Sequence, residues 1–260
     1  MIYTFYKYQG TGNDFILIDN RLNTFNKKDT KLVAKLCDRK FGVGADGLIL
    51  LEYSDTSDFK MIYFNADGNE STMCGNGGRC IVAFAQYLNI IDSETTFEAI
   101  DGLHYATVKE ETIALQMIDV FNVEENIKFS YLDSGSPHHV QLVSNLNEFD
   151  VKTEGSKIRY SDLYNKKGGS NINFVEQDNP STFRIRTYER GVEDETLSCG
   201  TGATAVAIAM YKRGLTTSLI NIIKVQGGTL TIKFKEDKGS YTNVFLEGPT
   251  QQVFKGKVEW

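Results

Sequence analysis

The stretches Cys74-Gly75-Asn76-Gly77 and Cys199-Gly200-Thr201-Gly202 carry one pattern twice, and their residue numbers differ by 125. A glutamate stands four residues before each cysteine. The same offset relates further pairs of identical residues, namely Gly10 and Gly135, Gly44 and Gly169, Tyr63 and Tyr188, Glu70 and Glu195, and Gly102 and Gly227. The sequence therefore predicts one α/β unit used twice, and duplicated units usually pack about a pseudo-two-fold axis.

Length and composition limit the kind of protein. At 260 residues, with 41% hydrophobic and 24% charged residues, the chain can hold two globular units of ordinary composition. The net charge of −6 and the scattered basic residues argue against a nucleic-acid partner. The sequence shows no 18-residue apolar run and no signal peptide, and its four cysteines fit a reducing compartment. We therefore expect a cytoplasmic protein that does not associate with a membrane.

The hydrophobic pattern predicts the elements of each half. Short β-branched and aromatic runs predict strands at residues 3–8, 15–19, 48–53, 59–64, 106–108, 113–118, 183–188, 229–234 and 244–246. Helical spacing predicts a helix of about three turns at residues 32–37 and longer helices after Cys74 and over 202–212, the last ended by Gly214. The tail is expected to return to the first half as a strand, which gives domains of 1–119 plus 250–260, and 120–249.

A cysteine at the start of each buried helix has a chemical consequence. Unpaired backbone N–H groups and the positive end of the helix dipole stabilise a thiolate there, and the same groups can hold a substrate carboxylate. Two such helices aimed at one point would stabilise the charge that builds when an α-carbon loses its proton. We expect the two thiols to approach a shared cleft from opposite sides, which is the geometry needed to invert a stereocentre.

Other roles for the cysteines are possible. A single Cys-Gly pair is most often part of the core, but the duplication of the motif favours chemistry. Neither motif is a Cys-x-x-Cys, and the spacing of Cys74 and Cys80 does not suit zinc, so no metal site is predicted. Cys37 and Cys80 lie on apolar helical stretches without a following Gly-x-Gly, and they are expected to pack in the core.

Five segments of the chain resemble the signature segments of diaminopimelate epimerase, in that family's order and spacing over nearly the whole length. They are Gly12-Asn13-Asp14-Phe15, Asn65-Ala66-Asp67-Gly68, the Cys74 motif with Arg79, Tyr188-Glu189-Arg190-Gly191 and the Cys199 motif. The resemblance implies a homodimeric isomerase that needs no pyridoxal phosphate or other cofactor. It would interconvert LL- and meso-2,6-diaminopimelate in lysine and peptidoglycan biosynthesis. It also implies an α/β fold of two pseudo-symmetric halves, each a curled mixed or antiparallel sheet around a central helix.

The resemblance also assigns roles to residues. Cys74 and Cys199 match the family's acid/base cysteines, and His138 and Glu189 match residues thought to tune the thiol pKa values. The residues that match substrate contacts are Asn13, Asn65, Gly75, Asn76, Asn171, Glu189, Arg190, Gly200 and Thr201. Without the resemblance, His138 is equally well explained as a structural histidine, and any single asparagine as a turn or cap residue.

Three positions depart from the family's pattern. Ser136 stands where an asparagine is common, so one contact to the distal end of the substrate is either shortened or made through water. Gly47 stands where a glutamine is often found, and that side-chain contact is lost. Phe254 replaces a tyrosine near the dimer contact of some members, and it keeps the ring without the hydroxyl.

Competing functions share parts of this pattern. Proline and hydroxyproline racemases use two cysteines, but Arg190 together with Asn65 and Asn171 argues for a substrate with a second zwitterionic end. The relative that isomerises a phenazine precursor has the fold without the paired cysteines. A non-catalytic binding module, in which Cys74 and Cys199 merely pack, would not exchange the α-proton of diaminopimelate in heavy water.

Overall fold

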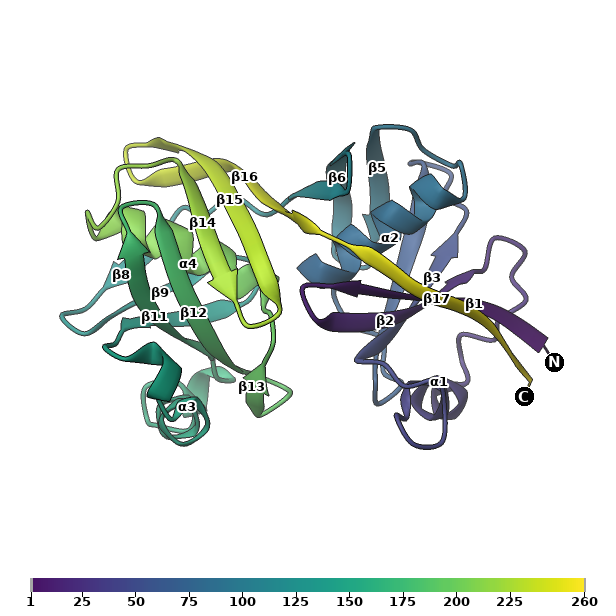
Figure 1. The fold of residues 1–260 in the computed structure, drawn as a ribbon, viewed down its shortest axis with the longest axis horizontal. Coiled ribbons are helices and arrows are strands. Elements are labelled where there is room, and N and C mark those ends of the chain that lie inside the picture. The colour runs from purple at the N-terminus through teal and green to yellow at the C-terminus, as the bar shows by residue number, and fades with distance from the viewer. Residues whose placement is uncertain (1, 260) are drawn as a thin grey trace. The chain divides into compact units, whose positions relative to one another are not determined.

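The computed structural model describes residues 2–259 and divides the chain into two compact units (Figure 1). Unit 1 comprises Met1–Leu115 and Gly248–Trp260, and unit 2 comprises Gln116–Glu247. The division into two independent domains, with a boundary after residue 119, stays a prediction. None of the helices formed by residues 2–259 has the length and apolar character needed to span a bilayer.

The sheet of unit 1 is antiparallel except at two parallel pairs, β2 with β3 and β4 with β5. Its strands in order are β17 (Gln251–Glu259), β1 (Ile2–Gly10), β2 (Asn13–Asp19), β3 (Gly47–Glu52), β4 (Phe59–Asn65), β5 (Glu94–Ala99), β6 (Gly102–Lys109) and β7 (Thr112–Gln116). The tail of the chain forms β17, drawn in yellow beside the purple β1 in Figure 1, and pairs with it antiparallel. The strand expected from the tail is therefore present.

The sheet of unit 2 repeats this topology. Its strands in order are β8 (Val123–Glu125), β9 (Phe129–Asp133), β10 (Pro137–Leu142), β11 (Asn171–Asn179), β12 (Thr182–Glu189), β14 (Ile220–Val225), β15 (Gly228–Asp237) and β16 (Ser240–Pro249). The short β13 (Asp194–Thr196) pairs with the end of β12. The parallel pairs are β10 with β11 and β12 with β14, which are the positions of the parallel pairs in unit 1.

Each unit has one central helix. These helices are α2 (Gly75–Tyr87) and α4 (Gly200–Lys212), and both of their bounds differ by 125. Helix α2 contacts β1, β2, β3 and β6, and α4 contacts β9 to β12, β14 and β15. Most of their residues are buried, as expected for a helix enclosed on all sides. The predicted fold of a curled sheet around a central helix is therefore confirmed.

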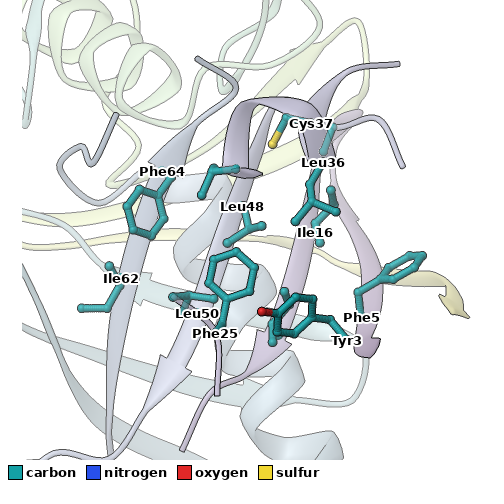
Figure 2. Packing of buried hydrophobic residues seen from close by; sticks show 13 residues of the cluster. Tyr3, Phe5, Ile16, Phe25, Leu36, Cys37, Leu48, Leu50, Ile62 and Phe64 are labelled. Atoms are coloured by element: carbon teal, nitrogen blue, oxygen red, sulfur yellow. The ribbon is translucent and has the colours of Figure 1, made fainter. Parts of the chain in front are cut away.

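The strands beside α2 are buried on both faces. A Cβ atom built on Gly77 of α2 would meet Phe15, Ile49 and Met61, so these side chains face the central helix. The intervening residues of β2 and β3 form a second cluster on the other face, with Leu36 of the outer helix α1 (Thr30–Cys37) (Figure 2). In unit 2 the outer helix is α3 (Val151–Arg159), beside the short 3₁₀ turns η1 (Leu146–Glu148) and η2 (Asn165–Lys167).

The predicted elements are confirmed with small corrections at their ends. Helix α1 has eight residues, about two turns rather than the three predicted, because the Asp38 side chain accepts the N–H groups of Lys40 and Phe41 and turns the chain away. Helix α4 begins at Gly200, two residues earlier than predicted. Gly214 ends it with a positive φ of 71°, as the sequence predicts.

Candidate active site

Cys74 and Cys199 are the N-cap residues of the two central helices. Both have extended backbone, with φ −93° and ψ 129° at Cys74 and φ −125° and ψ 111° at Cys199. The sulfur of Cys199 accepts the N–H group of Gly202 at 3.4 Å, whereas Cys74 makes no such cap bond. A thiolate is therefore stabilised by the backbone of α4 in unit 2, and by the dipole of the central helix in each unit.

The second glycine of the unit 2 motif, Gly202, is required because there is no room for a side chain at this position. A Cβ atom at Gly202 would lie 2.6 Å from the Asn173 side-chain oxygen and 3.3 Å from the Cys199 sulfur. At the equivalent Gly77 of unit 1, the nearest atom is the flexible end of Ile49 at 3.1 Å. The pattern is thus shared, but the demand for glycine is stricter beside Cys199.

Two asparagines accompany Cys74 in unit 1. The Asn13 side-chain oxygen lies 3.6 Å from the Cys74 sulfur, in position to accept the thiol proton. The same oxygen accepts a hydrogen bond from Asn76 at 3.2 Å, while the Asn13 amide group donates to Asp46 at 2.6 Å. Asn13, Asn76 and Cys74 are all predicted site residues, and the structure brings them together.

Arg79 holds the Asn76 side chain through a hydrogen bond. Its guanidinium is completely buried and donates to the Asn76 side-chain oxygen at 3.0 Å and to the Gly75 carbonyl at 3.3 Å. No ion pair joins it to a carboxylate among residues 2–259, and its Nε group has no hydrogen-bond partner there. Burial lowers the pKa of Arg79. A buried cation without a counter-ion is costly, so stability alone does not explain an arginine at this position.

His138 and Thr201 accompany Cys199 in unit 2. The Thr201 hydroxyl lies 3.4 Å from the Cys199 sulfur and 2.9 Å from Nε2 of His138. His138 is completely buried, and burial, with a smaller contribution from the Arg190 charge, lowers its pKa to about 3. The imidazole is therefore neutral at physiological pH and acts through its hydrogen bonds.

A cluster of polar side chains surrounds Ser136 in unit 2. Its hydroxyl accepts hydrogen bonds from the Asn171 amide group at 2.9 Å and from the exposed guanidinium of Arg190 at 3.4 Å. The Asn171 oxygen in turn accepts the backbone N–H of Arg190 at 2.9 Å. Glu189, the last residue of β12, accepts the Thr196 hydroxyl at 2.8 Å. This group can meet a carboxylate and an ammonium at the distal end of a zwitterionic ligand.

The remaining predicted positions differ in their surroundings. Gly75 and Gly200 are the buried first residues of α2 and α4, and Asn65 is exposed at the end of β4. A side chain at Gly47 would meet the Tyr63 ring and the Phe64 carbonyl at 2.6 Å. Tyr63 therefore occupies the space that a glutamine would need, and it accounts for the departure at Gly47.

The other two cysteines are core residues, as predicted. Burial raises the pKa of both the Cys37 thiol and the Cys80 thiol to about 12. All four cysteines are free. Within residues 2–259 no group of three or more His, Cys, Asp and Glu side chains is arranged to hold a metal ion.

Sequence reasoning missed several residues that hold the site together. Asp46 could have been found from the repeat, because the offset of 125 pairs it with Asn171. Arg79 stands out in the sequence only as part of a motif, since an arginine in a helix is ordinarily expected at the surface. Asn173 and Thr187 escape notice because β11 and β12 carry polar residues at many positions, and the sequence does not mark which of them are buried.

The fold and the site define a class, that of proteins built from paired α/β units whose central helices each begin at a cysteine. Solved structures share the fold. The phenazine biosynthesis protein of the PhzF family from Bacillus anthracis has a TM-score of 0.80 at 13% identity, with both chains covered completely. A hydroxyproline epimerase from Agrobacterium vitis has a TM-score of 0.71 at 14% identity, covering 99% of this chain and 92% of the other. At such identities the likeness shows the fold alone.

Sequence comparisons narrow this class to one family. The family model described as diaminopimelate epimerase matches residues 5–121 and 130–253. The diaminopimelate epimerase of Flavobacterium psychrophilum is 63% identical over 96% of this chain and 98% of the relative. That of Chlorobaculum tepidum is 44% identical over 96% of this chain and 98% of the relative. The chain belongs to the diaminopimelate epimerase family.

Proposed function

We propose that the chain interconverts LL- and meso-2,6-diaminopimelate by a cysteine acid/base mechanism. The observation that carries the proposal is the family match over nearly the whole chain, together with a cysteine at the N-cap of each of the two equivalent helices. The product serves lysine and peptidoglycan biosynthesis. The reaction belongs in the cytoplasm, where thiols stay reduced.

In the proposed reaction, Cys74 and Cys199 exchange roles with direction. One sulfur, as thiolate, takes the proton from the α-carbon and becomes a thiol. The other, as thiol, gives its proton to the opposite face of the same carbon and becomes a thiolate. The helix N-termini hold the α-carboxylate and the charge that develops on it, so the mechanism requires neither a metal nor pyridoxal phosphate.

The surrounding residues hold the substrate and tune the thiols. Near Cys74, Asn13 and Asn76 orient the reacting end, together with the backbone of Gly75. Near Cys199, Gly200 and Thr201 supply donors, and His138 acts on the thiol through Thr201. The residues assigned to the distal end of the substrate are Asn65, Asn171, Glu189 and Arg190.

The activity is tested by nuclear magnetic resonance in heavy water. Purified protein incubated with LL-diaminopimelate is expected to form the meso isomer with deuterium at the inverted carbon, without added cofactor. Dialysis against chelator and hydroxylamine should leave the rate unchanged. If proline or hydroxyproline is racemised and diaminopimelate is untouched, the chain has the racemase function instead.

A homodimer is part of the proposal. Phe254 on β17 is 45% exposed, and Val253 on the same strand and Ile2 on β1 are also exposed, so apolar side chains reach solvent on the outer strands of unit 1. Light scattering should give twice the 29.2 kDa chain mass at micromolar concentration. Replacing Phe254 with Asp should produce the monomer. A wild-type chain that stays monomeric at those concentrations would remove the dimer.

A further inference from the structure

A chain of buried hydrogen bonds leads from β12 to the site of unit 2. The Thr187 hydroxyl donates to the Asn173 side-chain oxygen at 3.0 Å, and the His139 carbonyl, which can only accept, identifies the other end of the amide as the nitrogen. The Asn173 amide nitrogen then donates to the His139 carbonyl at 2.9 Å and faces Nδ1 of His138 at 3.0 Å. Thr187 is 3% exposed, and Asn173 and His138 are completely buried.

The orientation of Asn173 determines the tautomer of His138. Because the amide nitrogen can only donate, Nδ1 of the neutral imidazole must accept, and the ring proton resides on Nε2. Nε2 then donates to the Thr201 hydroxyl oxygen at 2.9 Å. The hydroxyl proton of Thr201 is thereby left to point at the Cys199 sulfur, 3.4 Å away.

The repeat shows that this chain of bonds is confined to one unit. Beside α4, Gly202 faces the Asn173 side chain, whereas the equivalent Gly77 of α2 faces Ile49 of β3 and Met61 of β4. Both are buried apolar residues. Strands β3 and β4 of unit 1 therefore continue the apolar core where β11 and β12 of unit 2 carry the hydrogen bonds.

We propose that Asn173, held by Thr187, is a positioning residue that fixes the Nε2–H tautomer of His138 and so aims the Thr201 hydroxyl proton at the Cys199 sulfur. The inference rests on the proposed acid/base role of Cys199. The relay favours the thiolate through a neutral imidazole, and it does not require His138 to take up a proton. Arg190 is the charged group whose field acts on His138, and Glu189, at the end of β12, follows Thr187 by two residues.

The tautomer can be read directly with ¹⁵N-labelled histidine, because the chain contains only three histidines. We expect His138 of the intact protein to show a protonated Nε2 and an unprotonated Nδ1 throughout the range of about pH 5 to 9. In Asn173→Leu the fixed Nε2–H signature should be lost. Protonation at Nδ1 in the wild type, or titration of His138 near neutrality, would overturn the proposal.

The effect on Cys199 is measured by the pH dependence of its alkylation by iodoacetamide, followed by peptide mapping. Asn173→Leu should raise the apparent pKa of this alkylation by about one unit, as expected for the loss of one hydrogen bond to a charged sulfur. Thr201→Val should do the same, and the double variant should add nothing beyond Thr201→Val. Additive shifts would mean that Asn173 acts by another route.

A matched control separates this effect from general damage to the core. Asn221 is also completely buried in unit 2, where it donates to the Ser218 carbonyl at 2.9 Å, and Asn221→Leu should leave the alkylation profile unchanged.

If Asn173→Leu does not fold, Thr187→Val should give a smaller shift in the same direction, with Thr182→Val on the same strand as its control. If either control, Asn221→Leu or Thr182→Val, shifts the alkylation pKa as much as the variant it is paired with, the proposal is overturned. Neither measurement needs substrate, so an inactive protein with the predicted tautomer would refute only the proposed function.

Discussion

Among single residues, Arg79 has the environment that is hardest to explain by stability. Its buried guanidinium carries a charge without a carboxylate partner within residues 2–259 and holds Asn76 at 3.0 Å. Replacement by methionine keeps much of the volume and removes the buried charge, so we expect the melting temperature to stay the same or rise. Because Asn76 loses its donor, kcat/KM should fall about tenfold, which corresponds to one hydrogen bond.

Arg79→Lys serves as the comparison, since it keeps the charge but cannot donate to both Asn76 and Gly75 in the same geometry. Differential scanning calorimetry and steady-state kinetics on the two variants separate stability from function. A clear drop in melting temperature for Arg79→Met, with unchanged kinetics, would make Arg79 a structural residue only.

Arg190 gives a second test at the scale of the residue. It is exposed and contacts Ser136, so its planar group is available to a ligand carboxylate. Arg190→Lys should raise KM for diaminopimelate by about tenfold with a smaller change in kcat, because a lysine cannot form the two-pronged contact. Initial rates over a range of substrate concentrations decide this, and an unchanged KM would place the distal carboxylate elsewhere.

Among the elements, the start of α4 is more tightly constrained than the start of α2. A methyl group at Gly202 would press on Asn173 and on the Cys199 sulfur, whereas one at Gly77 meets flexible side-chain ends. Gly202→Ala should therefore lower stability by about 1–3 kcal/mol, the usual cost of overpacking, and reduce activity more than Gly77→Ala does. Urea unfolding and rate measurements on both variants check this. Equal effects would show that the two helix starts are equally constrained.

The elements are largely predictable from the sequence, whereas the links between them are not. Strands β1 to β4 and the central helices follow from local apolar patterns, and the repeat by itself points to the two N-cap cysteines. The partners of those cysteines depend on which residues meet across strands. Asn173 pairs with Thr187 only through the register of β11 and β12, and no local pattern reports a register.

For the molecule as a whole, two buried histidines predict how stability depends on pH. Burial lowers the pKa of His138 to about 3 and that of His139 to about 4, far below about 6.5 in an unfolded chain. Stability is therefore complete above about pH 6.5 and declines as the pH falls towards 4, because only the unfolded chain takes up the protons. At pH 5 the loss should be on the order of 2 kcal/mol per histidine.

Urea unfolding at pH 7.5 and pH 5 measures this loss. The variant His139→Gln should show about half of the wild-type dependence, because it retains only His138 as a buried histidine of this kind. A wild-type stability that does not change between these two pH values would contradict the neutral, buried state of both histidines.

The whole molecule also shows how a duplicated unit diverges. The offset of 125 pairs Asn13 with His138 and Asn76 with Thr201, so each cysteine has polar companions at equivalent positions. The chemistry differs, since Cys74 faces an amide oxygen and Cys199 faces a hydroxyl and a backbone N–H. The repeat could be predicted from sequence, but this difference required the hydrogen bonds.

The most direct test of the proposed mechanism is isotope exchange by the single variants Cys74→Ala and Cys199→Ala in heavy water. A variant that retains one thiol should still remove the α-proton from one face and return deuterium to that same face. We therefore expect one variant to label only LL-diaminopimelate and the other only the meso isomer, with interconversion reduced at least 10²-fold in both. If either variant still interconverted the isomers at a rate near that of the wild type, or if both labelled the same isomer, the two-cysteine mechanism would be wrong.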